Sequence, residues 1–86
     1  MVEDIVLTTP VDLVRALGEQ RAERFRALVA EAIEEHYPGS DFEHRIVPAV
    51  RTSVEVRWME RREREAEEIE RVVLECAEAA WDRVRR

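Results

Sequence analysis

Hydrophobic and polar residues alternate strictly over one stretch in the middle of the chain. From residue 50 to residue 58 the even positions are apolar or β-branched and the odd positions are polar. A period of two in such residues is typical of a strand with one buried face. We therefore expect a strand over residues 49–58, with Val54, Val56 and Trp58 facing the core.

The spacing of apolar residues becomes helical on both sides of this stretch. Between Pro10 and about Tyr37 they recur every three or four positions, which predicts an amphipathic helix. Gly18 would interrupt or bend this helix, and the Tyr-Pro-Gly sequence would end it. A second helix is expected from Met59 onward. Its apolar seam has a period of about 3.5 residues and consists of Ala66, Ile69, Val73, Cys76 and Ala80.

A short apolar run precedes the first helix. Ile5, Val6 and Leu7 are followed by Thr-Thr-Pro, and their length and β-branching favour a buried strand over residues 3–8. Thr9 has the residue type of a helix N-cap, with Pro10 at the first helical position. The first helix should therefore begin directly after this strand.

The segment between the first helix and the alternating stretch is ambiguous. Ser40 and Glu43 have the spacing of a capping box, which predicts a short turn of helix. Pro48 would then mark the beginning of the strand or a bulge at its edge. An alternative is one long helix from Pro48 to Arg86, because apolar residues of the alternating stretch also recur every four positions.

These elements predict a single small α+β domain over residues 1–86, in the order strand, long helix, strand, long helix. Two short strands do not form a stable sheet in water, and their edges would remain open to pairing. We therefore expect homodimerisation to complete the fold. The alternative is an all-α helical bundle with a long C-terminal helix from Pro48.

Composition restricts the class of protein. The net charge is −6, and all 14 basic residues are arginine. An acidic balance makes attraction of the whole surface to nucleic acid or anionic lipid unfavourable. The single cysteine, Cys76, allows no internal disulfide and indicates a reducing compartment. With neither a leader nor a long apolar run in the sequence, we expect a soluble cytoplasmic protein that does not bind membranes.

A run of charged residues follows the predicted strand. Between Arg57 and Arg71 five arginines face six glutamates, and several opposite charges lie four positions apart. This arrangement is typical of a solvated helix face rather than of a DNA-binding arm. A nucleic-acid-associated regulator remains an alternative function. Its contacts would come from an arginine patch on and after the second strand, formed by Arg45, Arg51, Arg57, Arg61 and Arg62.

The sequence offers few residues for catalysis or metal binding. His36 and His44 are the only histidines, and they lack enough neighbouring ligands of suitable spacing. Cys76 falls within the apolar seam, where a thiol packs as a small hydrophobic group. The chain has two glycines and no phosphate-binding loop. We predict no catalytic, cofactor-binding or metal-binding residue, and a non-enzymatic role is favoured over an enzymatic one.

The second helix has apolar residues on more than one flank. Leu74, Ala77 and Trp81 lie beside the main seam, and tryptophan is a common anchor of protein interfaces. The favoured function is therefore a protein-interaction, assembly or regulatory module that acts through a helix surface. Its expected partner is a second copy of the chain, and an unknown protein partner is also compatible. A further alternative is a metal-binding or catalytic dimer whose sites form only at the interface.

Overall fold

The computed structural model describes residues 4–57 and 63–86. The described residues form a small α+β fold with three strands in one sheet and three helices. In chain order these elements are β1 (Asp4–Pro10), α1 (Val11–Leu17), α2 (Glu19–His36), β2 (Asp41–Val47), β3 (Ser53–Arg57) and α3 (Glu63–Val84).

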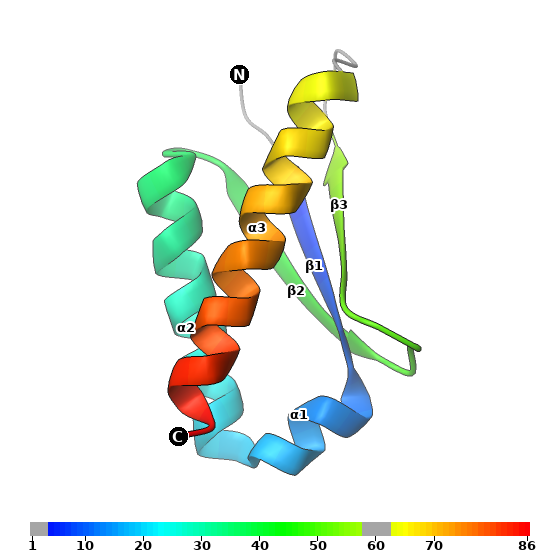
Figure 1. The fold of residues 1–86 in the computed structure, drawn as a ribbon, viewed down its shortest axis with the longest axis vertical. Helices are drawn as coiled ribbons and strands as arrows, with labels where there is room; N and C mark the ends of the chain where they lie inside the picture. Colours follow the sequence, from blue (N-terminus) through cyan, green and yellow to red (C-terminus); the bar gives the residue numbers. More distant parts are fainter. Residues whose placement is uncertain (1–3, 58–62) are drawn as a thin grey trace.

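The first strand of the chain is the central strand of the sheet. The strand order is β2-β1-β3, with β1 parallel to β2 and antiparallel to β3. Leu7 lies opposite His44 on one side and opposite Val54 on the other. Helices α2 and α3 lie side by side over one face of this sheet, and α1 crosses its lower end (Figure 1).

The core lies between the sheet and the two long helices. Ile5 and Leu7 are fully buried and point toward the helices, as expected for alternate positions of a central strand. Their helical partners recur at three- or four-residue steps along α2 and α3. They are Phe25, Val29 and Ile33 from α2, and Ile69, Val73, Ala77, Ala80 and Val84 from α3.

Gly18 divides the first helical region into two helices. It has φ 85° and ψ 161°, a conformation that is essentially restricted to glycine. The prediction of helical structure between Pro10 and about Tyr37 is therefore confirmed, and Gly18 interrupts the helix as expected rather than merely bending it. The break lets the chain cross the end of the sheet as α1 and then return along the sheet as α2 (Figure 1).

Thr9 is not the N-cap of the first helix. It belongs to β1 and is buried, and the cap position of α1 is taken by Pro10 without a side-chain hydrogen bond. Pro10 likewise ends the strand rather than begins the helix. The strand is thus two residues longer at this end than the sequence predicted, because Thr9 and Pro10 lie in register with Ile46 and Val47 of β2.

Residues 41–47 form a strand, so the short helical turn predicted from Ser40 and Glu43 was wrong. Phe42 and His44 are half-buried on the helical side of the sheet, and Glu43 is exposed on the other side. Pairing with β1 overrides the local capping signal. The alternation of buried and exposed positions around Phe42 and His44 indicates a strand, and the capping interpretation overlooked this signal.

The strand predicted from the alternating pattern is confirmed over Ser53–Arg57, with Val54 and Val56 facing the core, but its predicted start at residue 49 was wrong. Residues 48–52 belong to the loop between β2 and β3, so a single helix from Pro48 is excluded. Trp58 and Met59 lie outside the described residues. Because three strands pair within one chain, the sheet does not depend on a second copy for its third strand.

Candidate interaction site

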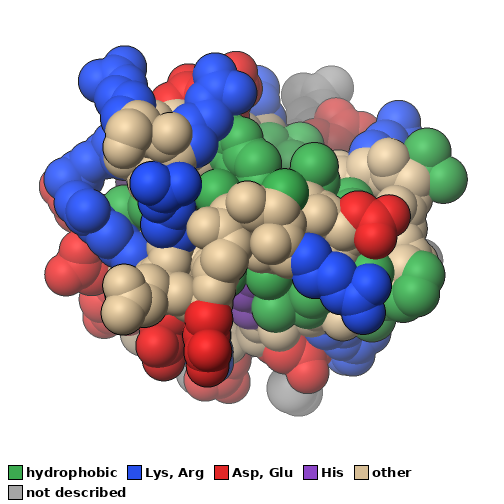
Figure 2. Space-filling model, turned by 90° about the horizontal axis from the view of Figure 1, so that it is seen from below, with side chains coloured by type: hydrophobic (Ala, Val, Ile, Leu, Met, Phe, Trp, Pro, Cys, Tyr) green, Lys and Arg blue, Asp and Glu red, His purple; other side chains and the backbone are tan. Residues whose placement is uncertain are grey.

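Apolar side chains line an open hollow at the end of the molecule where α1 crosses the sheet. Its volume is about 300 Å³. Leu13 of α1 and Leu74 of α3 lie at its rim, where 41% and 40% of their surfaces are exposed. Figure 2 views this end and shows hydrophobic side chains open to solvent between charged groups. The remaining apolar lining comes from Phe25, Ala77 and Trp81.

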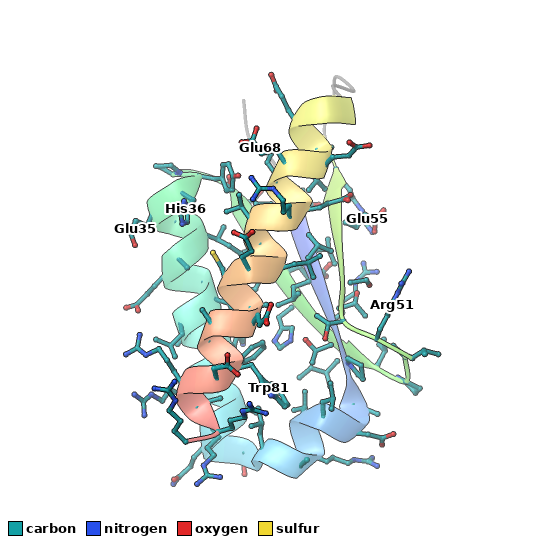
Figure 3. All side chains as sticks on the ribbon, viewed as in Figure 1. Glu35, His36, Arg51, Glu55, Glu68 and Trp81 are labelled. Atoms are coloured by element: carbon teal, nitrogen blue, oxygen red, sulfur yellow. The ribbon has the colours of Figure 1, made fainter. Side chains whose placement is uncertain are left out.

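The three interface residues predicted from the sequence all line this hollow, but they differ in exposure. Leu74 is exposed, Trp81 is half-buried and Ala77 is buried. The Trp81 ring meets the ring of Phe25 edge-on, with centroids 5.9 Å apart and an interplanar angle of 85°. The sequence placed Trp81 beside the main apolar seam, but in the structure it also belongs partly to the core. Figure 3 shows Trp81 on the lower part of α3.

Leu13 and Phe25 were not predicted as site residues. They join the site only because Gly18 turns the chain, so that α1 and α2 both approach α3. Helical periodicity identifies the flank of one helix but does not reveal which other helix lies opposite it. Long-range placement of this kind has no signal in a single sequence.

Beside the hollow, His44 connects β2 to β1. Its Nε2 atom lies 2.8 Å from Oγ1 of Thr9, and its ring packs against the rings of Phe25 and Phe42. Its Nδ1 atom is buried without a hydrogen-bond partner. Burial, and secondarily the positive charge of Arg26, lower the pKa of His44 below the ordinary histidine value. The ring thus acts as a neutral, largely apolar element of the helical side of the sheet.

The loop between β2 and β3 exposes an unbroken apolar sequence next to the hollow. We call residues 46–50 the apolar loop, although Ile46 and Val47 still belong to the end of β2. Val50 is 102% exposed, and Ile46 and Val47 are 45% and 39% exposed. Thr52, two residues beyond Val50, lines the hollow. The apolar loop and the hollow therefore lie next to each other.

The arginines of the predicted nucleic-acid patch do not form a free basic surface in the described part of the chain. Arg45 donates to Glu43 over 3.0 Å on β2, and Arg57 donates to Glu55 over 3.3 Å on β3. Both pairs lie on the sheet face away from the helices, on either side of the buried Val6. Arg51 is exposed in the loop, whereas Arg61 and Arg62 lie outside the described residues.

The described side chains that could bind a metal ion or act as a nucleophile are dispersed over the fold. Among residues 4–57 and 63–86 no three histidine, cysteine or acidic side chains are arranged to hold a metal ion. Cys76 is half-buried beside the outer groove between α2 and α3. Its thiol pKa is raised by burial and by the nearby carboxylates of Glu75 and Glu35. A thiol in such surroundings is a poor nucleophile.

Comparisons of the chain with protein-family models, curated proteins and solved structures gave no match. In the described part of the chain, none of the helices combines the length and apolar character needed to cross a membrane.

Proposed function

We propose that the protein is a non-enzymatic interaction module that binds its partner through the apolar hollow between α1 and α3. The observation that carries this proposal is the exposure of Leu13 and Leu74 at the rim of a hollow whose walls are also apolar. Apolar, concave surface with an aromatic side chain in its wall is typical of interface centres.

Closing the hollow supplies free energy for association. Complete burial of an exposed leucine contributes about 1.5–3 kcal/mol, so covering the half-exposed Leu13 and Leu74 contributes a part of that for each residue. This gain must exceed the loss of translational and rotational freedom on association. A binding partner must therefore bring apolar surface of its own to the hollow.

A second copy of the chain supplies such a surface. The same end of the molecule carries both the open hollow and the exposed apolar loop. A surface that contains both a concave and a projecting apolar feature is suited to a two-fold symmetric interface, in which each copy uses the same patch. We therefore propose a homodimer as the functional state.

The ion pairs on the outer sheet face weigh against the nucleic-acid alternative. Arg45 and Arg57 each have a carboxylate within 3.3 Å or less. These carboxylates would be brought up to the phosphate backbone together with the arginines, and repulsion would offset much of the attraction. Binding of an apolar partner through the hollow involves no such repulsion.

Light scattering coupled to size-exclusion chromatography tests the homodimer. We expect the wild type at micromolar concentration to have about twice the single-chain mass of 10.1 kDa. Leu74→Asp should lower the mass to that of one chain, because it places a charge at the rim of the hollow. Ala79→Asp is the matched control: it adds the same side chain at an exposed position on the outer groove of the same helix.

The measured masses distinguish a monomer, a dimer through the hollow and a dimer through the outer groove. A wild-type mass of 10.1 kDa at every concentration would refute the homodimer. A dimer that survives Leu74→Asp and dissociates with Ala79→Asp would move the interface to the outer groove between α2 and α3. Circular dichroism and urea denaturation of both variants show that any change in mass does not come from unfolding.

A further inference from the structure

The apolar loop is unusual because its hydrophobic side chains remain exposed in its own chain, although Ile46 and Val47 are partly covered by it. Residues 46–50 have the sequence Ile-Val-Pro-Ala-Val, and all five residues are exposed. A run of this length on a water-facing surface is a liability for folding and solubility unless it serves a function. Val50 is the extreme case, since its surface is 102% exposed.

The turn itself does not require apolar residues. The loop connects two strands that lie on opposite sides of β1, so it has to pass the end of the central strand. Polar residues and glycine are the usual choice in such connections, because they satisfy backbone groups and adopt turn conformations at low cost. The apolar composition therefore needs an explanation other than local backbone geometry.

We infer that the apolar loop of one copy docks into the hollow of a second copy, with Val50 entering between Leu13, Leu74 and Trp81 of that copy. The inference rests on the proposed homodimer and specifies how the two copies bind. The second copy inserts its own Val50 into the first in the same way. The apolar site is thus complete only when the partner supplies a side chain.

The placement of the two features permits this exchange. Thr52 lines the hollow and lies two residues from Val50, so the projecting and concave features are neighbours on one end of the molecule. A two-fold axis that lies in this surface, midway between the two features, brings the projection of each copy onto the hollow of the other. An isologous interface of this kind closes on itself and does not propagate into a filament.

Charges at the two features are complementary. Arg51 follows Val50 in the loop, and Glu78 lines the hollow. Both are exposed, and neither forms an ion pair with any of the described residues. In Figure 3, Arg51 extends from the loop away from Trp81, so it does not turn back toward the hollow of its own chain. When Val50 occupies the partner's hollow, Arg51 comes close to the partner's Glu78.

Substitution of Val50 gives the cleanest test, because a fully exposed side chain contributes little to the fold of its own chain. We expect Val50→Asp to raise the dimer dissociation constant at least about tenfold, since the dimer loses this contact twice. The unfolding of the monomeric chain in urea should not change. Ala27→Asp on the exposed side of α2 is the matched control and should leave the dissociation constant unchanged.

A charge exchange tests the orientation of the loop. Arg51→Glu and Glu78→Arg should each weaken the dimer, because each places two like charges together. The double variant should recover most of the wild-type affinity. Failure of the double variant to recover, with both single variants weakened, would overturn the placement of Arg51 beside Glu78 and with it this orientation of the loop.

Failure of the loop docking is distinguishable from failure of the homodimer. A wild type that is monomeric at all concentrations overturns both. A dimer that dissociates with Leu74→Asp but not with Val50→Asp overturns the loop docking alone and leaves the hollow as the interface. A monomeric wild type that binds phosphatidylglycerol vesicles through Val50 would overturn the docking in favour of a membrane surface.

Discussion

Thr9 and His44, 35 residues apart in the sequence, share a hydrogen bond of 2.8 Å between Oγ1 and Nε2 across the two parallel strands. The other ring nitrogen of His44 is buried without a partner. A protonated ring carries an N–H on both nitrogens, and the N–H on Nδ1 would have no acceptor among the described residues. Burial, and secondarily the positive charge of Arg26, favours the neutral ring and lowers the pKa of His44.

The first prediction concerns the effect of pH on stability. The pKa of His44 is lower in the folded state than the ordinary value of about 6.5, so the unfolded chain binds the proton more readily. Its contribution to stability is therefore complete above pH of about 6.5 and is lost as the pH falls toward the folded-state pKa. Urea denaturation at a series of pH values should show this decline.

Histidine variants isolate this contribution from the many carboxylates. His44→Gln should reduce the decline in stability that begins below pH of about 6.5. His36→Gln is the control, because His36 is exposed at the end of α2. Equal pH profiles for the wild type and His44→Gln would show that His44 is not responsible.

The second prediction concerns the hydroxyl group of Thr9. Thr9→Val keeps the shape of the side chain but leaves Nε2 of His44 without its partner. Leaving such a group unsatisfied costs about 1–3 kcal/mol, and the free energy of unfolding in urea should fall by this amount. Thr8→Val, on the adjacent and half-buried residue of β1, should change it by about 0.5 kcal/mol or less. Equal effects of the two variants would contradict a specific role for the hydrogen bond.

The third prediction concerns the break between α1 and α2. A Cβ atom at Gly18 would meet nothing within 4 Å, so any cost of substitution comes from the backbone conformation alone. Gly18→Ala should reduce stability by about 1–3 kcal/mol. D-alanine at this position, introduced by chemical ligation, adopts positive φ readily and should be close to neutral. Similar stabilities for the L- and D-alanine proteins would argue against strain at this residue.

The fourth prediction concerns the reactivity of Cys76. Because its thiol pKa is raised, a disulfide reagent at neutral pH should modify it more slowly in the native protein than in urea. Glu35→Gln removes one of the carboxylates that disfavour the thiolate and should accelerate labelling. Glu19→Gln, at the opposite end of α2, should leave the rate unchanged. A native rate equal to that of the unfolded chain would contradict this interpretation.

The helices and two of the strands could be predicted because their signals are local. The alternation of apolar and polar residues around Val54 and Val56 directly indicates a half-buried strand. The apolar run at Ile5–Leu7 indicates the strand that is central in the structure. The β2 strand was missed because the capping-box spacing of Ser40 and Glu43 competed with a weaker alternation. Its pairing with β1 is a long-range interaction, and local sequence preference does not determine such pairing.

The candidate site was predictable only on α3. Leu74 and Trp81 lie seven residues apart and therefore share a helix flank, which identified them from the sequence. The same spacing did not reveal that Trp81 is large enough to reach Phe25 in the core while also lining the hollow. Leu13 lies at the site because the chain turns at Gly18. Its position therefore depends on tertiary structure, which the spacing of apolar residues does not reveal.

The central position of β1 also determines when the sheet can form. Asp4 pairs with Asp41 on one side and with Arg57 on the other, so neither neighbouring strand is available until much of the chain has been synthesised. Closing such long loops is slow compared with forming helices. During translation α1 and α2 are complete before any strand of the sheet has a partner. Ile5–Leu7 therefore have no strand partner until residues 41–47 are synthesised, and α3 covers them only when the chain is nearly complete.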